Sequence, residues 1–252
     1  MKLSWALLLA VVLVSCWLAL YRLPFGDESK RYRFSQRLSD LTSLRAASAF
    51  AIFATVLYLG LGVAVLLAMS FSSNISVQDF VGRGSSVAII ATLLAILGCS
   101  SLNTLCMSVL YKLRPTIDVP GEISQIQWIS SILSLPRNFR WLIPAIAALV
   151  EELVFRGAIF IGLMHTGASF IVACSASTSL FVIGQIALVS TKTQAIVMGI
   201  SSVNLGIVGC LLVAGAGSIV PAVILHMSFA GFYTNMSVRS SKIRPQTQRW
   251  SL

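Results

Sequence analysis

Residues 150–160, VEELVFRGAIF, place two glutamates and an arginine inside an otherwise apolar stretch. The apolar run around them, residues 141–163, is long enough for a membrane span, which needs about 20 predominantly apolar residues. A charged side chain at the centre of a bilayer costs at least about 2.5 kcal/mol on insertion scales, so such groups face a bundle interior and find partners there. The stretch therefore predicts a buried helix that carries a polar site.

The composition of the whole chain is that of a membrane protein. Of its 252 residues, 57% are hydrophobic and only 10% are charged, whereas about 25% of the residues in a soluble domain are charged. Backbone groups in lipid must be satisfied within their own segment, so the apolar runs predict helices. We expect an all-α fold, a polytopic transmembrane helical bundle of about seven spans, with an uncleaved first span. The predicted spans are residues 3–21, 46–71, 87–111, 141–163, 168–190, 194–214 and 217–236.

Lysine and arginine residues between the predicted spans indicate the orientation, because cytoplasmic loops are enriched in them. With seven spans, fifteen basic residues fall on one side, and only Lys2 and Arg83 fall on the other. This distribution predicts an integral, multi-pass membrane protein with its N-terminus outside and its C-terminus in the cytoplasm. The fifteen are Arg22, Lys30, Arg31, Arg33, Arg37, Arg45, Lys112, Arg114, Arg137, Arg140, Lys192, Arg239, Lys242, Arg244 and Arg249.

The net charge of +10 follows from the same bias and does not indicate a nucleic-acid partner. The basic residues are not interleaved with aromatic residues that could stack on bases. Clusters such as residues 29–37, SKRYRFSQR, instead favour contact with anionic lipid headgroups. Residues 115–136 space apolar residues three or four apart, which predicts an amphipathic helix at the same surface. These apolar residues are Ile123, Ile126, Ile129, Ile132 and Leu133.

The three charges of the opening stretch divide into a pair and a single carboxylate. Glu152 and Arg156 are four positions apart, so they share a helical face and can pair. Glu151 is turned by about 100° from Glu152 and can look into a cavity. A desolvated carboxylate beside a like charge is a candidate general base. A purely structural ion pair explains Glu152 and Arg156 well, but it explains Glu151 poorly.

Polar partners for Glu151 are few in the other predicted spans. His226 is the only histidine within a span, and its coincidence with the glutamate pair favours a shared site over a satisfied core histidine. Gln185 can hydrogen-bond across helices. His165 lies at the outer end of the motif span, where an interfacial or capping role is expected.

At its first motif the chain resembles the CPBP membrane-protein family. This family comprises type II CAAX prenyl endopeptidases and bacteriocin-processing or self-immunity (Abi-like) proteins. Its motif EExxxR stands here as Glu151, Glu152 and Arg156, and the resemblance covers roughly residues 138–236. It implies a glutamate-activated water that attacks a peptide bond. Glu151 would be the base, and Glu152 and Arg156 its supporting pair.

The second and third motifs of the family are each half kept. FxxxH corresponds to Phe181 with Gln185 in place of histidine, and HxxxN corresponds to His226 with Ala230 in place of asparagine. The resemblance implies that these polar groups bind water and stabilise the oxyanion. Glutamine exchanges no proton near neutral pH, although its amide can donate a hydrogen bond, and alanine does neither. Losing one oxyanion donor costs about a hundredfold to a thousandfold in rate.

Two functions therefore remain open. The first is a CAAX-protease-like intramembrane endopeptidase that acts on a peptide or lipid-modified protein. The second is a catalytically lapsed relative that serves as a binding, assembly or immunity-type subunit of a membrane complex. A proton-coupled transporter is disfavoured because no internal repeat is evident. Membrane lipid, and a peptide substrate or partner subunit, are the expected partners.

No cofactor or metal is expected. The five cysteines lack ligand-like spacing and read as buried small hydrophobic residues. Glu151, Glu152 and His226 could in principle hold a divalent ion, but Arg156 beside them would be repelled by it.

Three regions are expected along the chain. Residues 1–137 would hold three spans, their loops and the amphipathic segment. Residues 138–236 would form a four-helix core, and residues 237–252 a basic cytoplasmic tail.

Overall fold

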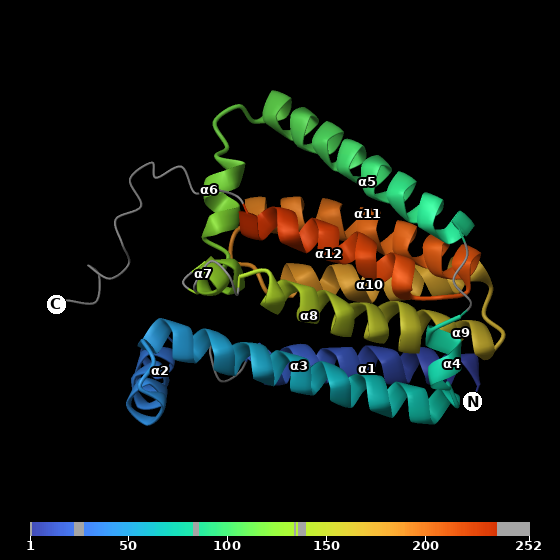
Figure 1. Cartoon of the computed structure of the whole chain (residues 1–252), viewed down its shortest axis with the longest axis horizontal. Helices are drawn as coiled ribbons and strands as arrows, with labels where there is room; N and C mark the ends of the chain where they lie inside the picture. The colour runs from blue at the N-terminus through green and yellow to red at the C-terminus, as the bar shows by residue number, and fades with distance from the viewer. Residues whose placement is uncertain (1, 23–27, 83–85, 134, 136–139, 236–252) are drawn as a thin grey trace.

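Every regular element in the described part of the chain is a helix (Figure 1). The computed structural model describes residues 2–22, 28–82, 86–133, 135 and 140–235. This confirms the prediction of an all-α helical bundle. The α-helices are α1 (Leu3–Arg22), α2 (Glu28–Thr42), α3 (Ala46–Ser73), α4 (Val77–Phe80), α5 (Ser86–Leu113), α6 (Val119–Ser124), α7 (Gln127–Leu133), α8 (Leu142–Glu152), α9 (Gly162–His165), α10 (Phe170–Ala187), α11 (Lys192–Ala216) and α12 (Val220–Asn235).

Five of the helices, α1, α3, α5, α10 and α11, are long and apolar enough to cross a membrane. A further apolar rod runs without a break from Leu142 to His165, because α8 continues through a π-helical segment, Leu153–Ile161, into α9. Helix α12 is apolar over the shorter stretch Val220–Gly231. These helices support a multi-pass membrane protein, and the total of seven spans stays a prediction.

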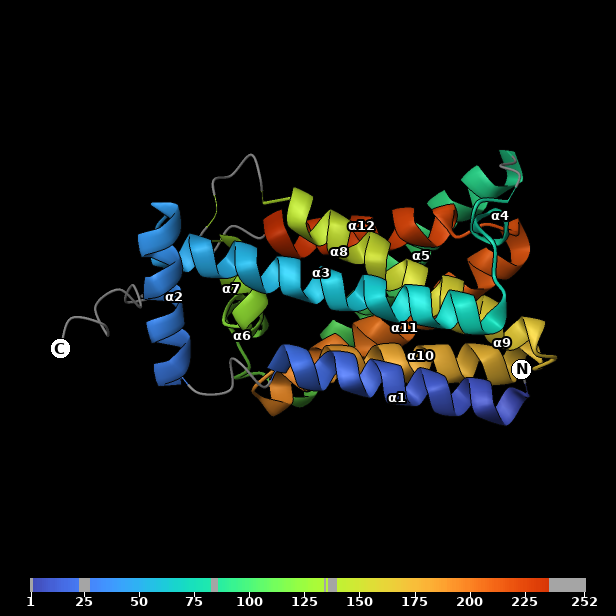
Figure 2. The ribbon, with the colours of Figure 1, turned by 90° about the horizontal axis from the view of Figure 1, so that it is seen from below.

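The rod from Leu142 to His165 occupies the middle of the bundle (Figures 1 and 2). Helices α1 and α3 lie on one side of it, and α10, α11 and α12 lie on the other. Helix α5 leans away from the bundle, and α2 lies across one end. We call this rod the motif helix. No residue from Val150 to Leu163 is exposed, so the part of it that carries the charges is enclosed by protein, as charged residues within a membrane require.

The basic residues of several predicted cytoplasmic loops gather at one end of the bundle. Helix α1 ends at Arg22, Lys192 begins α11, and α2 with its run of lysines and arginines crosses the same end (Figures 1 and 2). This agrees with a single basic face, while the side of the membrane on which it lies stays a prediction. Arg83, Arg137 and the tail at residues 237–252 lie outside the described residues.

The predicted amphipathic helix at residues 115–136 is two short helices, α6 and α7. Asp118 caps the first of them by accepting a hydrogen bond of 3.1 Å from the backbone N–H of Gly121. Ile123, Ile126 and Ile129 are buried and pack against α11. The spacing of the isoleucines therefore marks the face that packs against the bundle. A face that is buried against α11 shows the same three- and four-residue spacing as a face that is buried in lipid.

The π-helical segment begins directly after the glutamate pair. A π-helix leaves the ordinary backbone hydrogen-bond pattern, and such segments occur frequently at functional sites. The hydroxyl of Ser177 in α10 donates a hydrogen bond of 2.6 Å to the carbonyl of Phe155. A side chain at Gly157 would come within 2.7 Å of the ring of Phe80, so glycine there lets α4 approach. The segment is thus held by contacts on both of its flanks.

Candidate functional site

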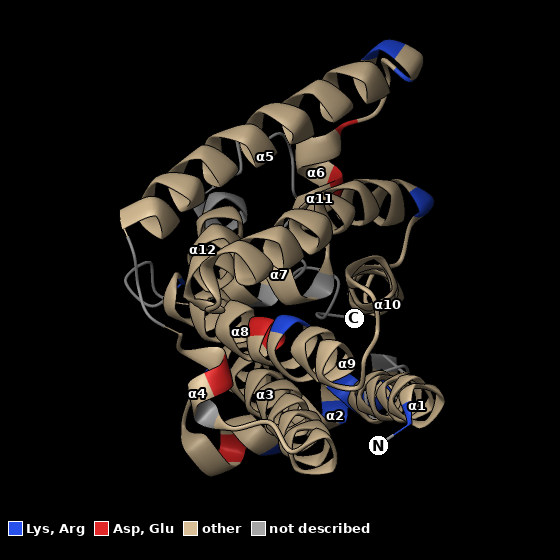
Figure 3. Ribbon diagram, turned by 90° about the vertical axis from the view of Figure 1, so that its right-hand side faces the viewer, with Lys and Arg blue, Asp and Glu red and all other residues tan. Residues whose placement is uncertain are grey.

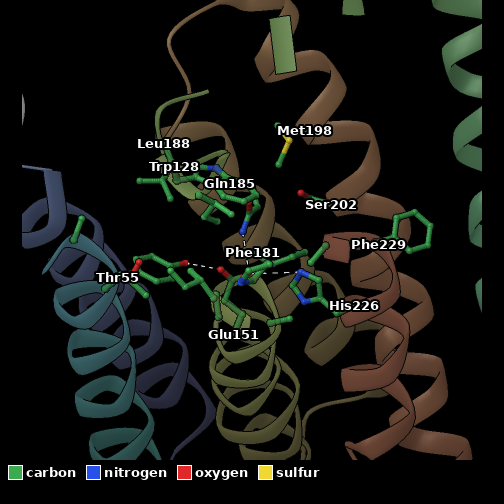
Figure 4. A pocket seen from close by; sticks show the side chains of 18 of the residues that line it. Thr55, Trp128, Glu151, Phe181, Gln185, Leu188, Met198, Ser202, His226 and Phe229 are labelled. Carbon is green, nitrogen blue, oxygen red and sulfur yellow. Dashed lines mark hydrogen bonds and ion pairs between the residues drawn. The ribbon is translucent and has the colours of Figure 1, made fainter. Parts of the chain in front are cut away.

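Glu151 lies at the wall of a cavity and accepts hydrogen bonds from two helices. The hydroxyl of Tyr58 in α3 donates a bond of 2.7 Å to Oε1, and the amide Nε2 of Gln185 in α10 donates a bond of 3.1 Å to Oε2. The imidazole of His226 in α12 brings its Nε2 to 3.8 Å from the same Oε2. Figure 4 shows Gln185 and His226 on either side of the cavity, close to Glu151. Both oxygens of the carboxylate are thus held by hydrogen bonds from neighbouring helices.

Glu152 is turned away from the cavity and joins Arg156 to His226. Its Oε1 lies 2.9 Å from Nη1 of Arg156 and 2.8 Å from Nδ1 of His226. An ionised carboxylate only accepts hydrogen bonds, so the contact places a proton on Nδ1 of His226. In the tautomer that carries its proton on Nδ1, the imidazole has an unprotonated Nε2, and this nitrogen faces Glu151. The second glutamate therefore sets the tautomer and orientation of the histidine.

Arg156 is completely buried, at 0% exposure, and its side chain packs against two other helices. Its guanidinium carbon lies 4.4 Å from the centre of the Phe181 ring of α10, a cation–π contact. Gly209 of α11 lies beside it, and a side chain added there would meet Nε at 3.0 Å. In Figure 3 a red and a blue segment lie side by side where α8 continues toward α9, inside the bundle. A buried guanidinium that contacts one carboxylate and one aromatic face locks the motif helix to α10 and α11.

The cavity in front of Glu151 has a volume of about 120 Å³, several times the space that one water molecule needs. Its walls come from α1, α3, α7, α8, α10, α11 and α12 (Figure 4). Most of the lining side chains are apolar, and the polar ones are few. The polar lining residues are Thr55, Tyr58, Glu151, Gln185, Ser201, Ser202 and His226, with Tyr21 at the α1 wall.

The residues predicted from the sequence occupy this one region of the structure. Glu151, Gln185, His226 and Ala230 line the cavity, whereas Glu152 and Arg156 lie behind it. Ala230 contributes no hydrogen-bonding side chain to the lining. His165 is apart from the site, exposed at the end of α9.

Tyr58 was missed by sequence reasoning, although it forms the shorter of the two hydrogen bonds to Glu151. It lies in the second predicted span, far in sequence from the charged motif. A tyrosine inside an apolar span is a weak signal, because the ring packs like any other aromatic residue. The hydroxyl contacts Glu151 only because α3 passes close to the motif helix.

A metal centre finds no support among the described residues. No group of three or more His, Cys, Asp or Glu side chains there could hold a metal ion, and the five cysteines are unpaired. Metal-independent chemistry nevertheless stays an expectation. It rests on the positive charge of Arg156 beside the carboxylates.

The comparison with protein families matches the part of the chain that contains the site. Residues 136–232 match the family model described as Rce1-like, type II CAAX prenyl endopeptidase Rce1-like. No curated protein and no solved structure matches the chain. The matched range begins just before α8 and ends within α12, so it includes Glu151, Glu152, Gln185 and His226 but not Tyr58.

Proposed function

We propose that this chain is an intramembrane endopeptidase of the CPBP family in which Glu151 activates water. The match of residues 136–232 to the type II CAAX prenyl endopeptidase family model supports this proposal. The observation that carries the proposal is the pair formed by Oε2 of Glu151 and Nε2 of His226, which are 3.8 Å apart at the cavity wall. A carboxylate and an imidazole at this separation can share one water molecule as acceptors of its hydrogens.

The reaction needs one proton acceptor that later becomes a donor. Glu151 takes a proton from water, and the resulting hydroxide attacks the carbon of the scissile carbonyl. The tetrahedral intermediate then collapses, the C–N bond breaks, and Glu151 returns its proton to the leaving amine. The new carboxylic acid gives its remaining proton to the amine, so the products are a carboxylate and an ammonium group, and no oxidant or reductant takes part.

The oxyanion of the intermediate needs hydrogen-bond donors. Gln185 donates one N–H to Glu151, and the second N–H of the same amide can donate to the oxyanion. Ala230 has no side-chain hydrogen-bond donor, so the site has fewer donors for the oxyanion than the three family motifs would provide. We therefore expect a slower enzyme than a member with all three motifs intact.

The substrate is proposed from the character of the cavity. Its walls combine a single carboxylate with mostly apolar side chains, among them Trp128, Ile132 and Phe229. An apolar peptide tail, or a tail that carries a prenyl chain, buries its surface favourably against such walls. Family membership points to the same class of lipid-modified protein tail.

The direct test uses the purified protein in liposomes and a farnesylated peptide that ends in a CAAX sequence. The peptide carries a fluorophore on one side of the cleavage site and a quencher on the other, so that cleavage raises the fluorescence. We expect cleavage by the wild type and a loss of about 10²–10⁴-fold in Glu151→Gln. Glu122→Gln is the matched control, because Glu122 lies in α6 outside the cavity, where its carboxylate accepts a hydrogen bond from Thr191 that glutamine can also accept.

Equal cleavage by the wild type and Glu151→Gln would exclude Glu151 as the base. Absence of cleavage in the wild type, together with a stoichiometric partner that still co-purifies with Glu151→Gln, would instead support a binding subunit.

A further inference from the structure

Helix α3 contacts Glu151 through Tyr58. Its hydroxyl donates a hydrogen bond of 2.7 Å to Oε1 of Glu151, across 93 positions of sequence. Helix α3, which carries Tyr58, lies wholly outside the range that matches the family. The hydrogen bond therefore adds to the site a group that none of the three family motifs supplies.

Helix α1 fixes the position of Tyr58. The indole N–H of Trp17 donates a hydrogen bond of 3.1 Å to the backbone carbonyl of Tyr58, and the two rings pack with their centroids 4.8 Å apart. Tyr21, one turn further along α1, meets the Tyr58 ring edge-on at 5.2 Å. Trp17 itself is only 2% exposed and stacks on Phe155 of the motif helix. The ring of Tyr58 therefore packs between α1 and Glu151.

A glycine one turn after Tyr58 sets the distance between α3 and the motif helix. A side chain at Gly62 would come within 2.7 Å of Val150, the residue before Glu151, and within 3.0 Å of Trp17. Glycine lets the backbone of α3 approach both neighbours closely. A side chain at position 62 would push α3 away from Val150 and Trp17, and therefore away from Glu151.

We propose that Tyr58 is a positioning residue, which holds Oε1 of Glu151 so that Oε2 faces His226 and the cavity. Tyr58 keeps its own proton and donates the same hydrogen bond throughout the reaction. The helices before the matched range thereby become part of the active site and are more than a membrane anchor. The catalytic consequence rests on the proposed peptidase function, whereas the link between Tyr58 and Glu151 can be measured without it.

The experiment compares Tyr58→Phe with Tyr111→Phe, which removes a hydroxyl from an exposed tyrosine in the last turn of α5. Cleavage of the farnesylated peptide is measured over a range of peptide concentrations. We expect Tyr58→Phe to lower kcat about 10–100-fold with little change in KM, because a misplaced catalytic group costs rate more than binding. Tyr111→Phe should match the wild type in both constants.

Thermal unfolding of the same proteins tests the link independently of cleavage. Tyr58→Phe should lower Tm by about 3–12 °C in the wild type, because the hydroxyl is bonded to a charged carboxylate. In the Glu151→Gln background the decrease should be about half as large, because a hydrogen bond to a charged group is roughly twice as strong as one to a neutral group.

Each outcome decides the proposal. If the wild type cleaves the peptide, an unchanged kcat in Tyr58→Phe overturns the positioning role. If the wild type does not cleave it, the peptidase function fails, and the melting temperatures alone decide the link. Equal decreases in the two backgrounds then overturn it, and unequal decreases support it.

Discussion

His226 and Glu152 are joined by a contact of 2.8 Å between Nδ1 and Oε1, and this contact separates the roles of the two adjacent glutamates. Glu152 holds the histidine and the arginine, and it lies behind the cavity. Glu151 faces the cavity and meets the other ring nitrogen of the same histidine at 3.8 Å. One imidazole thus connects the carboxylate that pairs with Arg156 to the carboxylate that faces the cavity.

Removing Arg156 should destabilise the protein strongly. In Arg156→Met the carboxylate of Glu152 keeps its burial, at 1% exposure, but loses its cationic partner. Breaking a buried pair in this way costs about 3–5 kcal/mol. Unfolding in detergent, followed by helical circular dichroism, measures the loss.

Arg33→Met is the control for this loss, since Arg33 is exposed on α2 and should change stability by less than about 0.5 kcal/mol. The double variant Arg156→Met with Glu152→Gln should recover part of the stability. A double variant as unstable as Arg156→Met alone would show that the ion pair is not the cause.

Gly62 and Gly60 provide a matched pair on α3. Alanine at position 62 would press on Val150 and Trp17, whereas alanine at position 60 meets nothing within 4 Å. We expect Gly62→Ala to cost about 1–3 kcal/mol and to lower kcat, because α3 must move away from Glu151. Gly60→Ala should be neutral or stabilising by up to about 1 kcal/mol. Equal effects at the two positions would show that the close approach of α3 does not matter.

Restoring a lost donor should speed the reaction. Ala230 lines the cavity where the family motif has asparagine, and Ala230→Asn returns an amide to that wall. We expect kcat for the farnesylated peptide to rise by about a hundredfold, the value of one oxyanion donor. Ala230→Leu has nearly the same shape without the polar group, and it should give no increase. A rise in both variants would point to packing rather than to hydrogen bonding.

The sequence predicted the fold class and the residues that meet at the cavity, for reasons that are local. Charges within an apolar helix must find partners, so Glu151, Glu152 and Arg156 marked a buried site. Gln185 and His226 were recognisable because polar side chains are scarce in the other helices. Their convergence on Glu151 depends on how the helices pack, and only the structure shows it.

Two features lay beyond the reach of sequence patterns. Tyr58 is one aromatic residue among many in an apolar helix, and its role depends on the contact between α3 and the motif helix at Gly62. The segment at residues 115–136 has a helical apolar period that burial against α11 and burial in lipid explain equally well. In both cases the deciding information is a tertiary contact.

The central claim is that Glu151 activates water and does not itself attack the peptide. A single turnover of the farnesylated peptide in water enriched in oxygen-18 tests this directly, with both the product and the Glu151 peptide analysed by mass spectrometry. We predict one labelled oxygen in the new carboxylate of the product and no label in Glu151. Label in the side chain of Glu151, which a covalent anhydride intermediate would leave there, would contradict the account.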